Sequence, residues 1–296
     1  MELSSKRPPQ HATALGVACG AGAALFWALG FVAARQGVTH GMSPLVIALD
    51  RFIWPGLVLL PFVARDGFSD LRIIGWRRGI MLTVFGGVPL ALLSYAGFVF
   101  VPLGHGGVIQ PSCASLGGLL LANLVLKEPL PLRRIAGALA IVLGLCIIGA
   151  EALKTMGAAG VGGDLLFVAA GCCFATFGML VRLWRIEPLA AMMVTTVLSL
   201  AALPALFFEL QNLLAAGFVE NLVQIVAQGA FAGAGAIYLF TRGVSLLGAS
   251  RAALFPALVP PFTLLIGYLA LGEIPSTSQL VGLATVVAGF WLTQRG

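Results

Sequence analysis

Long stretches without a charged residue recur along this chain and constrain its fold more than any other feature. A helix needs about 20 mainly apolar residues to cross a bilayer, because the hydrocarbon core is roughly 30 Å thick and a helix rises about 1.5 Å per residue. Uncharged windows of that size lie at residues 12–34, 188–208, 221–241, 252–272 and 274–294. Residues 79–126 hold two more, with a turn near Pro102, and further spans fit at about 44–64, 132–150 and 163–181. The sequence therefore predicts an all-α polytopic membrane protein of ten transmembrane helices.

Composition excludes the soluble alternative. Only 9% of the 296 residues are charged, whereas soluble domains carry roughly 25% and need them for a solvated surface. The apolar run 12–34 follows Lys6 and Arg7, as in a signal peptide, but it is longer than a typical signal core. We therefore expect it to be a retained first helix.

The distribution of Lys and Arg predicts the orientation, because basic residues accumulate in cytoplasmic loops. With the N-terminus inside, 14 of the 17 basic residues lie on the cytoplasmic side, and only Arg35, Arg51 and Lys154 lie outside. The opposite orientation reverses this ratio. Both termini are predicted to be cytoplasmic, and the high pI of about 9.4 is a signal of topology rather than of nucleic-acid binding.

An internal repeat appears when the chain is shifted by 145 residues. The shift superposes two prolines, two glutamates and two pairs of glycines without a gap: Pro111 on Pro256, Glu128 on Glu273, Gly137 on Gly282 and Gly144 on Gly289. Five spans separate the copies, and an odd number turns the second copy upside down in the membrane. The sequence thus predicts two inverted five-helix repeats, residues 1–155 and 156–296. Inverted repeats are typical of secondary transporters, because two such halves can exchange conformations.

Each half ends in a helix–Glu–helix hairpin, at Leu126-Lys127-Glu128-Pro129-Leu130 and at Leu271-Gly272-Glu273-Ile274-Pro275. Ten spans in two halves with these hairpins resemble the EamA-type branch of the drug/metabolite transporter superfamily. Within it the chain is most similar to the YddG-type exporters of aromatic amino acids, although Pro129 directly after the glutamate departs from the commoner hairpin pattern. The resemblance implies a secondary transporter in the bacterial inner membrane that exports aromatic and other apolar amino acids, methionine among them, and related small metabolites by alternating access.

Two other functions remain open at this point. Inverted repeats also occur in channels, so a passive channel or facilitator for small solutes is the main alternative. The third is a membrane scaffold that transports nothing.

Paired helix interruptions are the best pointer to a binding site in such proteins. A proline inside a helix removes one backbone hydrogen bond and leaves a free carbonyl that needs a partner or a cavity. Pro111 and Pro256 form such a repeat-related pair, and Gln110 and Ser112 add polar atoms beside the first. A packing kink is the alternative for both prolines.

Aromatic residues supply the other candidates. Tyr95 precedes Pro111 by 16 residues and Tyr238 precedes Pro256 by 18, so each tyrosine can face its kink across a helical hairpin. Trp27 lies inside the first span with Phe31 one turn further on. Such side chains suit a substrate with apolar and zwitterionic parts. Interfacial anchoring or plain packing explains them equally well.

Few ionisable residues lie within the predicted spans, where burial is costly. Asp50-Arg51 is either a partly buried pair or a pair at headgroup level, His105 begins the fourth span, and Glu128 and Glu273 are expected to be structural. No mid-span Asp or Glu stands out as a proton carrier.

The sequence predicts no enzyme and no cofactor. It contains no Gly-x-Ser-x-Gly, no His-Glu-x-x-His and no Walker-type loop, so no catalytic residue, no metal site and no ATPase partner is expected. The predicted partners are a small-molecule substrate, such as an amino acid, and the lipid bilayer.

Overall fold

A computed structural model describes residues 10–127, 131–247 and 255–294. These residues form helices joined by short turns, without a strand. The first half of the chain contains α1 (Gln10–Thr39), α2 (Pro44–Arg65), α3 (Ser69–Ile74), α4 (Trp76–Gly86), α5 (Val88–Gly97), α6 (Leu103–Leu126) and the beginning of α7 (Leu132–Leu183). The rest contains α8 (Pro188–Leu198), η1 (Ser199–Ala202), α9 (Ala205–Phe208), α10 (Leu210–Gln224), η2 (Ile225–Gly235), α11 (Ala236–Leu247), η3 (Phe255–Leu258), α13 (Val259–Leu271) and α14 (Thr277–Gln294).

Six helical segments of the described chain are long and apolar enough to cross a membrane: Thr13–Thr39, Pro44–Arg65, Trp76–Gly97, Leu103–Leu126, Leu132–Leu183 and Leu210–Leu247. Shorter apolar helices occupy Pro188–Ala202, Phe255–Leu271 and Thr277–Leu292. The polytopic, all-α fold is thereby confirmed, while the count of ten spans stays a prediction.

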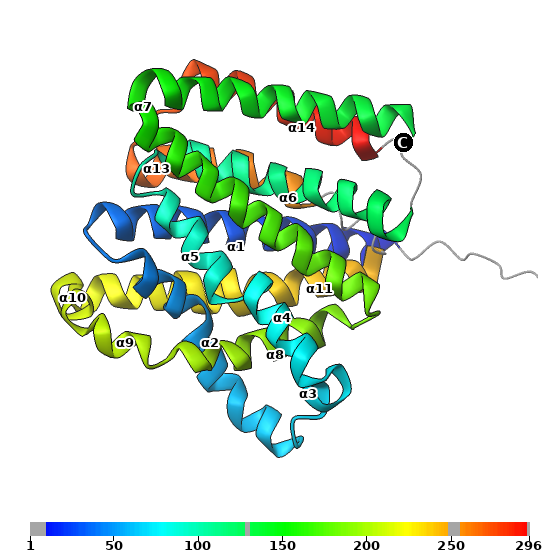
Figure 1. Ribbon diagram of the computed structural model, residues 1–296, viewed down its shortest axis with the longest axis vertical. Coiled ribbons are helices and arrows are strands. Elements are labelled where there is room, and N and C mark those ends of the chain that lie inside the picture. The colour runs from blue at the N-terminus through cyan, green and yellow to red at the C-terminus, as the bar shows by residue number, and fades with distance from the viewer. Residues whose placement is uncertain (1–9, 128–130, 248–254, 295–296) are drawn as a thin grey trace, which may run out of the picture.

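The 52 residues of α7 are too many for a single crossing, since a straight helix of that length spans about 78 Å. The chain folds back at Gly157, where φ is 63° and ψ is −149°. A positive φ is accessible to glycine because it has no Cβ. Figure 1 shows α7 running beside α14 and then turning back across the bundle.

Helix α1 lies in the middle of the molecule, where it packs against η2 and α11 on one side and α13 on the other (Figure 1). Around it, α2 contacts α5, η2 and α8, while α6 contacts both α7 and α13. The central core includes the fully buried rings of Phe98 and Phe167, whose centroids lie 5.0 Å apart. Helices from both halves of the chain therefore share one interior.

Four glycines form the seam between α7 and α14. A Cβ added to Gly144 would lie 2.7 Å from the carbonyl oxygen of Gly282, and one added to Gly289 would lie 2.7 Å from that of Gly137. The shift of 145 residues exchanges these two contacts, as a two-fold axis between the two helices would. Small residues are needed here because the backbones touch.

We expect Gly144→Ala to lower the thermal unfolding midpoint in detergent by several degrees. Its Cβ would meet backbone, which cannot move aside as a flexible side chain can, and such overpacking costs about 1–3 kcal/mol. Gly118→Ala in α6 is the matched control, since its Cβ meets nothing within 4 Å and alanine favours a helix. An equal midpoint for the two variants would contradict the tight seam.

Candidate functional site

The third predicted span of each half is irregular. In the first half the helix breaks between α4 and α5 at Gly87, which has φ −100° and ψ −147°. In the second half, η2 is a π-helical segment of 11 residues, and the shift of 145 residues carries Gly87 onto Ala232 inside it. Such interruptions are frequent at functional sites because they disturb the regular hydrogen bonding of the helix backbone.

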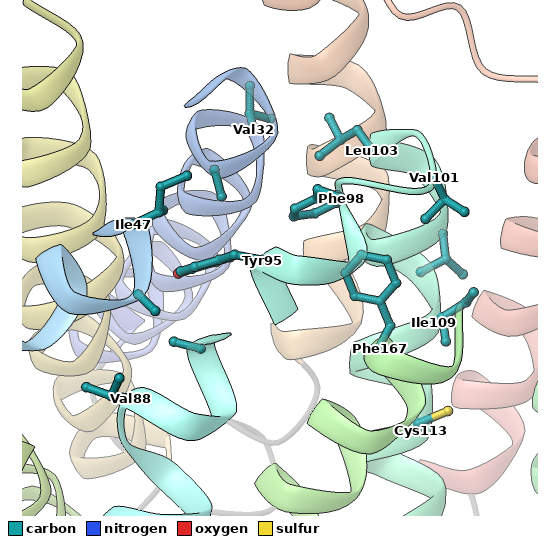
Figure 2. Packing of buried hydrophobic residues seen from close by; sticks show 14 of the residues in the cluster. Val32, Ile47, Val88, Tyr95, Phe98, Val101, Leu103, Ile109, Cys113 and Phe167 are labelled. Carbon is teal, nitrogen blue, oxygen red and sulfur yellow. The ribbon is translucent and has the colours of Figure 1, made fainter. Parts of the chain in front are cut away.

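Tyr95 of α5 and Gln228 of η2 meet between these irregular segments. The buried hydroxyl of Tyr95 donates to Oε1 of Gln228 at 2.7 Å, and Nε2 of Gln228 donates to the carbonyl oxygen of Gly30 at 2.8 Å. A guanidinium nitrogen of Arg51 donates to the Tyr95 oxygen at 3.3 Å. We call Gly30, Arg51, Tyr95 and Gln228 the central polar cluster. In Figure 2 the Tyr95 oxygen points toward Ile47 of α2 and away from Phe98 and Phe167.

Arg51 brings a positive charge into this cluster, and no described residue provides an acidic partner for it. The ion pairs between described residues are Arg35–Glu273, His40–Glu220 and His105–Asp164, and none of them includes Arg51. Its neighbour Asp50 is buried and accepts a hydrogen bond from the indole N–H of Trp54 at 2.8 Å. The predicted Asp50–Arg51 pair is therefore not formed, because consecutive helix residues point about 100° apart. The half-buried guanidinium retains donors that can bind an anion.

Two of the predicted aromatic residues lie on α1 and contact other rings. Trp27 packs against Phe240 of α11, with centroids 5.4 Å apart, and Phe31 meets Phe98 edge-on at 6.1 Å. Phe31 lies one residue from Gly30 of the central polar cluster. The predicted Phe31 and Tyr95 are thus brought to the region where α1 and α5 meet.

The predicted residues around Pro111 lie further along α6, in a helix that continues through the proline. Ser112 is buried and its hydroxyl donates to the carbonyl oxygen of Val108 at 2.7 Å, so it takes up a backbone acceptor within its own helix. The side-chain oxygen of Gln110 is buried without a hydrogen-bond partner. Only Gln110 of this group offers an unused polar atom.

Tyr238 and Pro256 lie elsewhere. The Tyr238 side chain is 67% exposed on α11, and Pro256 belongs to the short 3₁₀ segment η3 at the start of α13. No hydrogen bond joins either residue to the central polar cluster in the described chain. The structure therefore places Tyr95 beside Arg51 and Gln228 and leaves Tyr238 on the surface of the bundle.

Glu273 lies at the end of the bundle that carries the turn between α1 and α2. We call this end the α1–α2 end. The Glu273 carboxylate binds Arg35 Nε at 2.7 Å and accepts from the backbone N–H of Leu103 at 2.9 Å, where α6 begins. Arg35 also donates to the Phe98 carbonyl oxygen. Glu273 was expected to be structural; its repeat partner Glu128 lies outside the described residues. A pocket of about 360 Å³ opens beside Arg35 and Phe98, against the α1–α2 turn.

A row of polar residues runs from this end toward the central polar cluster. Glu220, Gln224 and Gln228 follow one another at four-residue spacing, and Gln224 donates to the carbonyl oxygen of Ala33 at 2.7 Å. Glu220 binds His40 of α1 at 3.0 Å. Sequence reasoning missed these residues and Asp164. The four-residue spacing of polar side chains in an apolar stretch was a usable signal, because such residues share one helix face.

Across the described ranges, no group of three or more His, Cys, Asp or Glu side chains is arranged to hold a metal ion.

The comparisons with known proteins agree with this architecture. The model of the EamA-like transporter family matches twice, at residues 14–150 and 161–295. A protein of Archaeoglobus fulgidus described as an uncharacterized transporter is 25% identical over 91% of this chain and 95% of its own length. The uncharacterized transporter YyaM of Bacillus subtilis is 25% identical over 93% of this chain and 92% of its own length. A crystal structure with 20% sequence identity superposes with a TM-score of 0.61 over 96% of this chain and 97% of the other, so the two share a fold.

Proposed function

Because this chain belongs to the EamA-like transporter family, we propose that it is a secondary transporter that exports amino acids and related small carboxylates across the bacterial inner membrane by alternating access. The preferred substrates are aromatic and other apolar amino acids, including methionine. The Trp27, Phe31 and Tyr95 rings supply apolar surface along α1 and α5, and the central polar cluster binds the charged part of the substrate.

Arg51 is the observation that carries this proposal. A cation held at membrane depth is costly unless it is paired, and the described residues give Arg51 only the neutral Tyr95 oxygen. A guanidinium binds a carboxylate through two parallel hydrogen bonds, and a substrate carboxylate would provide the missing negative charge. Tyr95 and Gln228 orient the guanidinium, since the tyrosine hydroxyl is itself fixed by its bond to Gln228.

Alternating access requires two bodies that move against each other, and three observations support this division. The family model matches each half separately. The glycine contacts between α7 and α14 are exchanged by the repeat shift. Each of the three ion pairs between described residues joins a residue of the first matched stretch to one of the second. We therefore propose ten spans in two inverted halves, residues 1–155 and 156–296, with both termini cytoplasmic and the α1–α2 end facing the periplasm.

Counterflow in proteoliposomes tests the proposal. We expect vesicles preloaded with unlabelled phenylalanine or methionine to accumulate the labelled amino acid transiently above its equilibrium level, because a carrier that returns loaded exchanges faster than one that returns empty. Protein-free vesicles are the control. A panel of amino acids without any counterflow, but with simple equilibration, would favour the passive channel instead.

A further inference from the structure

A histidine and an aspartate are paired in the apolar interior of the protein. Nδ1 of His105, the third residue of α6, lies 2.9 Å from Oδ1 of Asp164 on the second part of α7. His105 is 0% exposed and Asp164 is 8% exposed. Buried ionisable groups are rare unless they are paired, and neither residue belongs to the central polar cluster.

The pair leaves two polar atoms without partners. Nε2 of His105 and Oδ2 of Asp164 are both buried and form no hydrogen bond with any residue that the structure describes. A Cβ added to the adjacent Gly106 would meet the rings of Phe98 and Phe167, and one added to Gly149 would lie 4.0 Å from Oδ2 of Asp164. An ionised Asp164 beside a neutral imidazole would leave one uncompensated negative charge in these surroundings. An imidazolium would cancel that charge, because the pair would then be neutral overall.

Other charged groups near the pair are engaged elsewhere. Arg35 on α1 and Glu273 in the α13–α14 turn bind each other at the start of α6. Glu151 on the first part of α7 accepts a hydrogen bond from Ser276 at 2.7 Å, and Lys154 is exposed. On α5 the ionisable Tyr95 is bonded to Gln228, and the neighbouring faces of α13 and α14 present Thr263 and Gln279, which are uncharged. His105 is therefore the group that can balance Asp164.

The pair also crosses the boundary between the moving bodies, since His105 lies in the first matched stretch and Asp164 in the second. We propose that His105 and Asp164 form a proton-binding site that is filled while the α1–α2 end is closed and is emptied when the two halves separate there. The inference rests on the proposed function only for the separation of the halves, not for the identity of the substrate.

The direction of the pH effect follows from the proton balance. In the closed state the imidazolium of His105 faces the carboxylate of Asp164. When the halves separate, both groups enter water and no longer have to balance each other's charge, so the additional proton can leave. One proton passes from Nδ1 or Nε2 to water, and Asp164 keeps its charge. Rising pH therefore favours opening, by up to about tenfold per pH unit for one proton.

Accessibility of a single cysteine tests this directly, without any substrate. Val101 is 1% exposed in the α5–α6 turn and packs against Gly163, the neighbour of Asp164. The reporter is Val101→Cys in a chain whose five free cysteines are replaced by serine or alanine. Val99→Cys in the same turn is 54% exposed before substitution and corrects for the pH dependence of thiol chemistry. An impermeant maleimide is applied at the α1–α2 end.

We expect the ratio of labelling rates, Val101→Cys over Val99→Cys, to rise at least about fivefold between about pH 5.5 and pH 7.5. Asp164→Asn and His105→Gln should each remove this dependence. His40→Gln should keep it, because His40 belongs to the exposed pair with Glu220 at the same end.

A ratio that does not change with pH in the otherwise unsubstituted reporter overturns the proton site, and so does a dependence that survives in both Asp164→Asn and His105→Gln. Either result leaves the proposed function intact if counterflow is observed. If no amino acid shows counterflow but the labelling ratio depends on pH, the proposed substrate class is contradicted and the proton site is supported.

Discussion

Arg51→Gln should lower the initial rate of amino-acid export in proteoliposomes about 10- to 100-fold. The substitution removes the charge that is unpaired among the described residues, and a hydrogen bond to a charged group contributes about 1.5–3 kcal/mol. The loss should be specific to substrates that carry a carboxylate. The corresponding amines, which lack it, should be transported by Arg51→Gln no more slowly than by the unsubstituted protein.

Two variants separate charge from geometry at this position. Arg51→Lys keeps the charge but not the planar fork, so we expect an intermediate rate. Arg77→Gln, at the exposed start of α4, changes the net charge equally and should transport normally. Unchanged export of carboxylates by Arg51→Gln, at equal protein amounts, would remove Arg51 from the substrate site.

Glu273→Ala should increase labelling of the Val101→Cys reporter from the α1–α2 end at least about tenfold. A loss of about 1.4 kcal/mol in the free energy that favours the closed end raises the population of the open state by that factor. The carboxylate holds Arg35 of α1 and the first backbone N–H of α6 at once. Removing it leaves a half-buried guanidinium without its acidic partner, which costs more than losing an exposed ion pair. The expected result is a protein that opens at this end more often.

His40→Ala is the matched control for closure. Its ion pair with Glu220 also crosses the two halves, but the imidazole side chain is 58% exposed, and exposed pairs contribute about 0–1 kcal/mol. We expect less than about a fivefold change in labelling. The charge exchange Arg35→Glu with Glu273→Arg should recover part of the closure. Equal labelling of Glu273→Ala and His40→Ala would show that the Arg35–Glu273 pair does not hold this end shut.

Several features of the fold could be read from the chain. The uncharged windows predicted an all-helical membrane protein, because apolar residues in such numbers cannot cover a soluble surface. The repeat at 145 residues predicted two similar halves, and the family model matches the chain twice, at residues 14–150 and 161–295. The glycines that revealed the repeat are also those at which α7 and α14 touch. Close backbone contact allows only a small residue, so the positions of this helix contact can be recognised in the sequence.

The site was less accessible to such reasoning. Proline was taken as the sign of an interrupted helix, yet α6 continues through Pro111, while the third predicted spans are irregular at Gly87 and in η2. Tyr95 was chosen for its distance from Pro111, but its described partners are Gln228 and Arg51. Gln228 lies 133 residues away along the chain, and nothing local distinguishes a glutamine that bonds across helices from one that does not.

Hydrophobicity, charge and small residues act locally and leave a periodic record, and that record was enough to predict a helical membrane protein with a duplicated plan. The pairing of polar groups became visible only once the helices were packed together: Arg51 meets Tyr95, Glu273 meets Arg35, and His105 meets Asp164. In an apolar interior a polar side chain of this kind can be satisfied only by a polar group that another helix brings within hydrogen-bond distance. That choice depends on how distant helices pack, and no short stretch of sequence contains it.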